Sequence, residues 1–323
     1  MRRSNFSDLM QQDHVAIVGA GAVGCYFGGM LARAGIGVTL IGRDAHVEAI
    51  RRDGLFLERA DFQEFVRVGA HSTISEVNCA GIVLLSVKTV DTETAAAATA
   101  PHLRKDAVLV SFQNGVDNVE RIQRATGIRA MPAVVYVAAT ITGPGRVKHG
   151  GRGDLVVGEP SFGLERPESV RRVAQLFESA RIQCRVSSNI AVELWTKLVM
   201  NCAYNAISAV TQSRYLAIRE NPLTQAVIQQ SVEEVVAVGK AAGVALPNAE
   251  HLTAAALKLG EAMANATSST AQDLARGRPT EIDSLNGYVS RRGKELGIPT
   301  PVNSTLHALV KLLEDTGHKR HKK

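Results

Sequence analysis

The sequence is poor in aromatic residues: only 4% of its 323 residues are Phe, Trp or Tyr, whereas 45% are hydrophobic. Ala, Val, Leu and Gly are plentiful, and this mixture favours α/β and helical packing over an all-β sandwich. A chain of this length can bury a substantial core, and we expect two domains.

Long apolar runs and cysteine or histidine clusters are also missing. No stretch reaches the about 18 apolar residues that cross a membrane. The polar N-terminus has an Arg pair with no apolar run behind it, so we expect no secretory signal and a soluble cytoplasmic protein. Four cysteines (Cys25, Cys79, Cys184 and Cys202) lack CxxC spacing, which is typical of free thiols in a reducing compartment. The nine histidines form no HExxH motif, so no metal site is predicted.

Positive charge is concentrated at the C-terminal end. The formal net charge is +6, and Lys319, Arg320, Lys322 and Lys323 supply four positive charges within the last five residues. We expect residues 317–323 to form a disordered basic tail, and residues 1–13 a flexible extension. Since no basic stripe with interleaved aromatics accompanies the tail, nucleic-acid binding is not expected.

Short apolar runs alternate with helical patterns from His14 onward. HVAIVG, GVTLIG, GIVLLSV, AVLVSF and PAVVYVAA indicate buried strands, and LFLERADFQEFVRV indicates a hairpin. We interpret the glycine-rich ITGPGRVKHGGRGD as a turn that leads into the strand DLVVG. The prediction is an α/β fold: a Rossmann-type, doubly wound parallel sheet with an antiparallel edge over 14–187, and a second, all-helical domain over 188–316.

The motif GAGAVG joins the first strand to the first helix. In such a GxGxxG motif, Gly19 permits a tight turn, Gly21 lets a pyrophosphate approach the backbone, and Gly24 lets helix and strand pack closely. The helix N-terminus, with Ala22 and Val23, offers unpaired N–H groups to the phosphates. The alternative is a glycine-rich turn that binds nothing.

The end of the second strand distinguishes NADP from NAD. An NAD enzyme usually has Asp or Glu there, bonded to the ribose 2′-hydroxyl. This chain has Gly42 followed by Arg43, whose guanidinium can bind a 2′-phosphate, so NADP(H) is favoured. Asp44 is the competing candidate for the acidic residue of an NAD enzyme, although it lies one residue beyond the usual position.

Two further strand ends carry polar residues. Lys88 follows one strand and Asn114 follows another. Because ligands of doubly wound sheets bind outside the carboxyl ends of the strands, both are candidates for cofactor or substrate binding. The alternatives are a surface lysine and a plain Asn-Gly turn.

Lys197, Asn201 and Asn205 are spaced i, i+4, i+8 in an otherwise apolar helical segment. Each step of four advances by about 40° around a helix, so the three side chains fall on one side. Polar groups in such a helix are costly unless they face a polar cavity; the alternative is an exposed polar stripe. Two later stretches, SSTAQD at 268–273 and PTEID at 279–283, are candidates that alone also fit ordinary helix starts.

Taken together, these motifs resemble the ketopantoate reductases (2-dehydropantoate 2-reductases). The matching signatures are GAGAVG at 19–24, SVKT at 86–89, QNG at 113–115, W-x-K-L-x-x-N-x-x-x-N at 195–205, SS…QD at 268–273 and PTEID-x-x-NG at 279–287. The resemblance implies an NADP(H)-dependent reduction of a small 2-oxo acid, 2-dehydropantoate, to pantoate by hydride transfer, a step of pantothenate and coenzyme A biosynthesis.

The resemblance also implies roles for individual residues. Lys197 and Glu281 match the catalytic pair. Asn114, Asn201, Asn205 and Ser269 match positions that contact substrate. Lys88, together with Asn114 and Glu281, matches positions close to the cofactor.

One departure from the family pattern leaves the substrate open. Family members often have a further substrate-binding asparagine about ten residues after the position of Asn205, and the run 211–215 contains none, although Gln212 is a candidate substitute. A related reductase of another 2-oxo acid, or a non-catalytic NADP(H)-sensing protein, therefore remain alternatives. Apolar helices such as 223–241 allow a homodimer.

Overall fold

The computed structural model describes residues 14–159 and 167–320. Two compact units are present. Unit 1 comprises the described residues up to Gln113 and those from Asp117 to Ile190, and unit 2 comprises Asn114–Val116 and the described residues from Ala191 onward. The chain leaves unit 1 after Ile190, compared with a predicted boundary after residue 187. The extension expected at 1–13 lies outside the described residues.

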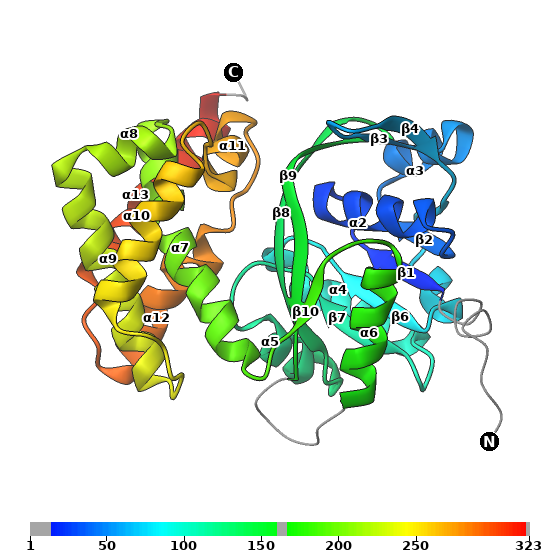
Figure 1. The fold of residues 1–323 in the computed structure, drawn as a ribbon, viewed down its shortest axis with the longest axis horizontal. Coiled ribbons are helices and arrows are strands. Elements are labelled where there is room, and N and C mark those ends of the chain that lie inside the picture. Colours follow the sequence, from blue (N-terminus) through cyan, green and yellow to red (C-terminus); the bar gives the residue numbers. More distant parts are fainter. Residues whose placement is uncertain (1–13, 160–166, 321–323) are drawn as a thin grey trace. The chain divides into compact units, whose positions relative to one another are not determined.

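Unit 1 is built on a 10-stranded sheet with the order β4-β3-β9-β8-β7-β6-β1-β2-β5, and β10 pairs with β9 (Figure 1). The strands are β1 (Val15–Val18), β2 (Val38–Ile41), β3 (Leu55–Glu58), β4 (Gln63–Val66), β5 (Gly69–His71), β6 (Ile82–Leu85), β7 (Val108–Ser111), β8 (Met131–Gly143), β9 (Arg146–Val157) and β10 (Cys184–Val186).

The centre of this sheet is parallel and buried on both faces. β1 pairs in parallel with β2 and β6, and all four of its residues are buried. Val15 and Ile17 pack in one hydrophobic cluster, while Ala16 and Val18 pack in another. Continuous apolar strands are expected where helices cover both faces, so the doubly wound prediction is confirmed.

Helices cover the two faces of the sheet separately. The helices α2 (Ala22–Arg33), α3 (Asp44–Asp53) and α6 (Pro167–Ser179) supply apolar residues to the first cluster. The second cluster contains residues of η1 (Ile74–Cys79), α4 (Thr92–Thr99) and α5 (Asn118–Thr126). Two short 3-10 helices, η2 (Thr89–Asp91) and η3 (Ala100–His102), flank α4.

The interpretation of the glycine-rich stretch as a turn is wrong. β8 and β9 form a long antiparallel ribbon, drawn in green in Figure 1, and the turn between them is confined to Pro144 and Gly145. The ladder has register shifts along the ribbon, and Gly151 and Gly153 have φ values of 149° and 145°. Glycines at β-bulges serve such backbone conformations, so they here mark irregularities within a strand. The hairpin prediction is confirmed by the antiparallel pair of β3 and β4.

Unit 2 is helical in all its described regular elements, as the sequence predicts. Its helices are α7 (Ile190–Thr211), α8 (Tyr215–Glu220), α9 (Pro222–Ala241), α10 (Ala249–Ala262), α11 (Ser269–Ala275), η4 (Ile282–Ser284), α12 (Asn286–Leu296) and α13 (Pro301–Arg320). The side chains of their own N-cap residues cap several of them: Asn221 for α9, Asn248 for α10 and Ser268 for α11. Each accepts backbone N–H groups that have no partner within the helix.

The prediction of a disordered tail from residue 317 is wrong for its first part. α13 continues through Arg320, while residues 321–323 lie outside the described part of the chain. Leu306 and Val310 bury one side of α13 in the core of unit 2, which stabilises the helix.

Candidate active site

The turn between β1 and α2 has the geometry of a phosphate-binding loop. Gly19 has a φ of 108°, and a Cβ there would lie 2.7 Å from the backbone nitrogen of Val87. A Cβ on Gly24 would lie 2.3 Å from the carbonyl oxygen of Gly19. By contrast, a Cβ on Gly21 would meet nothing within 4 Å. The fold therefore requires glycine at 19 and 24, whereas Gly21 borders open space.

The first turn of α2 faces this open space with unpaired backbone groups. Gly21 is the N-cap and is exposed, and Ala22 and Val23 are half-buried at the start of the helix. The first N–H groups of an α-helix have no partner within the helix. These groups and the helix dipole suit a phosphate.

The end of β2 excludes an acidic side chain. β2 ends at Ile41, and a Cβ on the following Gly42 would lie 2.6 Å from the Cβ of Ala20. Arg43 is the N-cap of α3 and is exposed. Asp44 is the first residue of α3, one position further on. A carboxylate thus has no room at the position used for the ribose 2′-hydroxyl, and a guanidinium is next in the chain.

Lys88 lies in a loop that contacts the glycine turn between β1 and α2. It is half-buried after the end of β6 and is the N-cap of η2. In the same loop, the hydroxyl of Ser86 donates a hydrogen bond of 2.7 Å to the carbonyl oxygen of Gly19. The loop that carries Lys88 therefore packs against the glycine turn between β1 and α2.

Lys197, Asn114 and Glu281 are joined by hydrogen bonds within unit 2. The Nζ of Lys197 donates to Oδ1 of Asn114 at 2.8 Å. The Nδ2 of Asn114 donates to Oε2 of Glu281 at 2.8 Å. The asparagine amide thus presents its oxygen to the cation and its nitrogen to the anion. We call this set of three residues the amide bridge.

The polar residues of α7 do not form an exposed stripe. Lys197 and Asn201 are half-buried, and Asn205 is only 4% exposed. Within the described residues the side chain of Asn201 forms no hydrogen bond, and that of Asn205 is contacted by the Tyr215 hydroxyl at 3.4 Å from Oδ1. Asparagine amides both donate and accept hydrogen bonds, so this side of α7 can recognise hydroxyl and carboxylate groups.

Of the two neighbouring serines at the start of α11, Ser268 makes the contacts with α7. Its hydroxyl donates to the backbone oxygen of Asn205 at 3.0 Å and accepts from the N–H of Ala271 at 3.0 Å. The predicted site residue Ser269 is exposed, as the first residue of α11. The structure brings this turn next to Asn205. Gln212, the candidate substitute for the missing asparagine, is exposed, and its amide donates to the carbonyl oxygen of Ala209.

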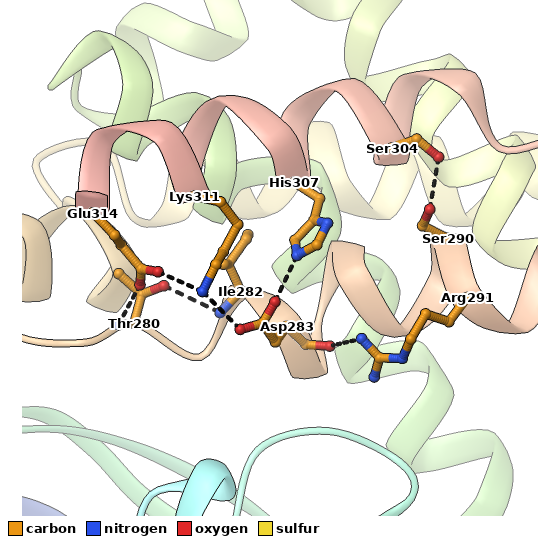
Figure 2. A network of polar contacts seen from close by, with 9 residues as sticks. All are labelled: Thr280, Ile282, Asp283, Ser290, Arg291, Ser304, His307, Lys311 and Glu314. Carbon is orange, nitrogen blue, oxygen red and sulfur yellow. Dashed lines mark hydrogen bonds and ion pairs between the residues drawn. The ribbon is translucent and has the colours of Figure 1, made fainter. Parts of the chain in front are cut away.

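A polar cluster on α13 holds the segment that carries Glu281 (Figure 2). Asp283 accepts hydrogen bonds from His307 at 2.6 Å and from Lys311 at 2.9 Å. Glu314 accepts the backbone N–H of Thr280 at 2.7 Å. The sequence reasoning missed all three α13 residues. The available signal was their i, i+4, i+7 spacing in the segment HALVKLLE, which places them on one side of the helix.

The charges of this cluster change the pKa values of its members. The hydrogen bond from His307, assisted by the Lys311 ammonium, holds the pKa of Asp283 well below its usual range. Burial alone raises the pKa of Glu314, but hydrogen bonds from Lys311 and Thr280 outweigh this and lower it. The carboxylates of Glu314 and Asp283 raise the pKa of Lys311. All three groups are therefore charged at neutral pH.

A second missed network lies beneath α7. The buried Asn286 of the PTEID-x-x-NG motif donates to Oδ1 of Asn303 at 2.9 Å and to the backbone oxygen of Cys202 at 3.4 Å. Asn303 in turn donates to Glu234 at 2.7 Å. Glu234 also accepts the backbone N–H groups of Val302 and Asn303, as a cap for α13. The network connects α7, α9, α12 and α13, so it fixes the helix that carries Lys197 in unit 2.

The cysteines and the potential metal ligands are candidates for a further site. Cys25, Cys79, Cys184 and Cys202 are free thiols, and burial raises the pKa of Cys25 and Cys184 to about 12. In the described residues, no group of three His, Cys, Asp or Glu side chains is arranged to hold a metal ion. None of the helices described reaches the length and apolarity that crossing a bilayer would require.

Comparisons with known proteins identify the family of the chain. The family model described as ketopantoate reductase PanE/ApbA matches residues 15–161, and the one described as ketopantoate reductase PanE/ApbA C terminal matches residues 189–314. The chain belongs to the ketopantoate reductase family. The resemblance inferred from the motifs is thus confirmed.

Relatives of the family match over nearly the whole chain. The 2-dehydropantoate 2-reductase of Pyrococcus abyssi is 32% identical over 301 residues, which span 92% of this chain and 96% of that protein. The crystal structure of a PanE/ApbA family ketopantoate reductase from Ralstonia eutropha JMP134 is similar with a TM-score of 0.87 and 47% identity, covering 94% of this chain and 99% of the other. A D-mandelate dehydrogenase, solved with NADH and anilino(oxo)acetate, is similar with a TM-score of 0.88 and 25% identity, covering 94% and 99%.

Proposed function

We propose that the chain reduces 2-dehydropantoate to pantoate with NADPH, as a step of pantothenate and coenzyme A biosynthesis. The observation that carries the proposal is the amide bridge, in which an ammonium, an amide and a carboxylate are linked by two contacts of 2.8 Å. It occurs in a chain whose relatives over more than nine tenths of its length are named 2-dehydropantoate 2-reductases.

Lys197 is the proposed acid of the reaction. When hydride adds to a ketone carbon, negative charge develops on the ketone oxygen and must be neutralised. The Lys197 ammonium can stabilise that charge and then donate a proton to the oxygen. Asn114 holds the Nζ of Lys197 from one side, and Glu281 fixes the orientation of the Asn114 amide. Glu281 is proposed to act with Lys197 in catalysis and to contact the cofactor.

The residues of the β1–α2 turn fit a dinucleotide. NADPH, when bound, supplies the hydride. Gly21 borders open space at a helix N-terminus, where Ala22 and Val23 offer backbone N–H groups to phosphate, while Gly19 and Gly24 shape the turn. The exposed guanidinium of Arg43 is proposed to bind the 2′-phosphate, and Lys88 to lie close to the cofactor.

The substrate is proposed to lie against α7. Asn201 and Asn205 are assigned to its hydroxyl and carboxylate groups, with Asn114 and Ser269 as further contacts. A second candidate is a related reduction of another 2-oxo acid. Two observations favour it: the similarity to a D-mandelate dehydrogenase, and the buried Tyr215, which follows the stretch without the expected asparagine and contacts Asn205.

An NADPH oxidation assay with a panel of 2-oxo acids tests the proposal. We expect the highest kcat/KM with 2-dehydropantoate, compared with a branched acid that lacks the hydroxyl and with an aryl 2-oxo acid, and NADPH is expected to be used better than NADH. Higher efficiency with another acid would favour the second candidate. Tight NADPH binding without oxidation by any acid would favour a non-catalytic NADP(H)-sensing protein.

A lysine variant tests the mechanism. Lys197→Ala is expected to lower kcat by about 10²-fold while NADPH still binds. Lys240→Ala, which removes an exposed lysine from α9, is the matched control and is expected to leave kcat unchanged. Near-normal turnover of Lys197→Ala would exclude this residue as the proton donor.

Our proposal also covers the localisation, the partners and the oligomeric state of the enzyme. We expect a cytoplasmic protein that binds no nucleic acid and no membrane and that forms a homodimer. Leu309, Leu312 and Leu313 are exposed on α13, which supports the dimer because contiguous apolar side chains favour protein contacts. Light scattering of the purified protein measures the mass directly, and a monomer at micromolar concentration would contradict the dimer.

A further inference from the structure

Glu281 lies in an irregular segment. Residues 278–280 have no regular secondary structure, and Glu281 is the N-cap of the short 3-10 helix η4. Such a segment lacks the ladder of backbone hydrogen bonds that fixes a side chain on a long helix or a central strand. Its carboxylate nevertheless lies 2.8 Å from Nδ2 of Asn114. The position of Glu281 must therefore be set by contacts on either side of it.

Two attachments come from α13, and Arg291 of α12 also donates to the backbone oxygen of Asp283 at 2.9 Å. On the N-terminal side, the backbone N–H of Thr280 donates to Oε1 of Glu314 at 2.7 Å. On the C-terminal side, the carboxylate of Asp283 accepts from Nε2 of His307 at 2.6 Å and from Nζ of Lys311 at 2.9 Å. The segment is thus held immediately before Glu281 and two residues after it (Figure 2).

Lys311 connects the two attachment points. Its Nζ lies 2.9 Å from Oδ2 of Asp283 and 2.8 Å from Oε2 of Glu314. Without this ammonium, the two carboxylates would lose the cation that they share, and like charges repel. Lys311 therefore couples the attachment at Thr280 to the attachment at Asp283, on either side of Glu281.

The packing around the segment has room for this arrangement only because of a glycine. A Cβ on Gly287 would lie 2.8 Å from Nε2 of His307 and 3.1 Å from the carbonyl oxygen of Ile282. Ile282 is fully buried between the two attachment points. The glycine of the PTEID-x-x-NG motif thus lets the α13 side chains reach the segment that carries Glu281.

We propose that Lys311 is a positioning residue for Glu281. By bridging Asp283 and Glu314 it fixes the segment whose carboxylate orients the amide of Asn114. This inference rests on the proposed function, because it assigns a role in the same site. It extends that site to a helix face with no part in binding the substrate or the cofactor.

The simplest alternative is that Lys311 stabilises α13 and nothing more. Three variants separate the two roles: Lys311→Met removes the charge and keeps most of the side-chain volume, and Lys311→Arg keeps the charge. Arg219→Met is the matched control, because it removes another partly exposed ion pair of unit 2, with Glu261, that does not touch residues 280–283.

We expect Lys311→Met to lower kcat for NADPH oxidation with 2-dehydropantoate by about tenfold, because small misplacements of catalytic groups are costly. The Kd of NADPH should change much less than kcat, since the proposed phosphate and ribose contacts are in unit 1 and only the contact of Glu281 would be affected. Lys311→Arg should recover most of kcat, and Arg219→Met should keep it. A kcat of Lys311→Met equal to that of Arg219→Met would overturn the proposal.

A double-mutant cycle tests whether Lys311 acts through Glu281. In a Glu281→Gln background, Lys311→Met is expected to lower kcat by less than about twofold, because residues that act as a unit are not additive. The same tenfold loss in both backgrounds would show that Lys311 acts independently of Glu281.

A crystal structure of Lys311→Met keeps this test separate from the proposed function. We expect the distance between Asn114 Nδ2 and Glu281 Oε2 to exceed hydrogen-bonding range. An unchanged distance would overturn the positioning role even if the natural protein reduces 2-dehydropantoate. If the natural protein reduces no 2-oxo acid, the proposed function fails, while the measured distance still decides whether Lys311 sets the position of Glu281.

Discussion

Asn114 and Glu281 are separated by 167 positions in the chain, yet their side chains meet at 2.8 Å in the same compact unit. Asn114 follows β7, the last strand on the Rossmann side before α5, while Glu281 precedes η4 in the helical unit. The amide between them has a defined orientation, because Lys197 donates to its oxygen. A rotation of the Asn114 amide by 180° would break both hydrogen bonds, because it would place the nitrogen at Lys197 and the oxygen at Glu281.

The first prediction concerns this amide. Asn114→Ala should lower kcat/KM for 2-dehydropantoate by about 10²-fold, a loss typical of removing one preorganised polar group from an active site. Asn265→Ala, at an exposed asparagine of unit 2, is the control and should have little effect. Steady-state kinetics of both variants measure the difference, and equal kcat/KM values would exclude a role for the bridge.

Arg43 is expected to select the phosphorylated cofactor. Arg43→Ala should raise KM for NADPH by about 10- to 100-fold, since hydrogen bonds to charged groups contribute about 1.5–3 kcal/mol. KM for NADH should change little, because NADH has no 2′-phosphate. Arg52→Ala removes an exposed arginine from the same helix, paired with Asp53, and serves as the control. Equal effects of Arg43→Ala on the two cofactors would exclude the 2′-phosphate role.

Two glycines of the same turn should respond differently to alanine. Gly21→Ala places its Cβ in open space, so its Tm should match that of the natural protein while its Kd for NADPH rises. Gly24→Ala forces a Cβ against the carbonyl oxygen of Gly19, and overpacking of this kind costs about 1–3 kcal/mol or more. Thermal unfolding and cofactor titration measure both quantities. A normal Kd for Gly21→Ala would mean that no phosphate group approaches there.

The acid stability of the protein should depend on Asp283 and Glu314. Hydrogen bonds lower the pKa of both carboxyls in the folded state, relative to unfolded values of about 3.9 and 4.3. Their contribution is complete above those unfolded values and is lost as the pH falls toward the folded ones. We therefore expect a free energy of unfolding that decreases from about pH 5 downward.

Asp283→Asn should flatten this acid dependence. The variant removes one of the two shifted carboxyls, so its free energy of unfolding should fall less steeply between about pH 5 and pH 3. Asp315→Asn removes an equal charge from exposed α13 surface and should keep the natural slope. Denaturant unfolding at a series of pH values gives the slopes, and parallel curves for all three proteins would contradict the assignment.

Local patterns were sufficient for some parts of the site. The spacing of Lys197, Asn201 and Asn205 predicts one side of one helix, and α7 contains all three. The GAGAVG motif predicts a strand, a turn and a helix, which β1 and α2 confirm. Both predictions depend only on residues close together in sequence, for which helical periodicity and the needs of a tight turn are sufficient physical grounds.

Other parts depend on tertiary packing that a single sequence does not reveal. The contact between Thr280 and Glu314 exists because η4 and α13 pack together, and nothing local to either residue signals it. The glycines of β9 suggest a turn when taken alone, whereas pairing with β8 makes them bulges in a ribbon. The basic residues at the end of the sequence suggest a disordered tail from residue 317, whereas α13 continues through Arg320. Leu306 and Val310 anchor this helix in the core, and a single sequence does not reveal that packing.

The chain enters the helical unit twice, first for only Asn114–Val116. Dissecting the protein at residue 191 would therefore separate Lys197 and Glu281 from the amide that links them. A C-terminal fragment expressed alone would contain Lys197 and Glu281 but not Asn114, which lies between them in the intact protein. An N-terminal fragment added in trans would have to insert Asn114–Val116 into the helical unit before any turnover returned.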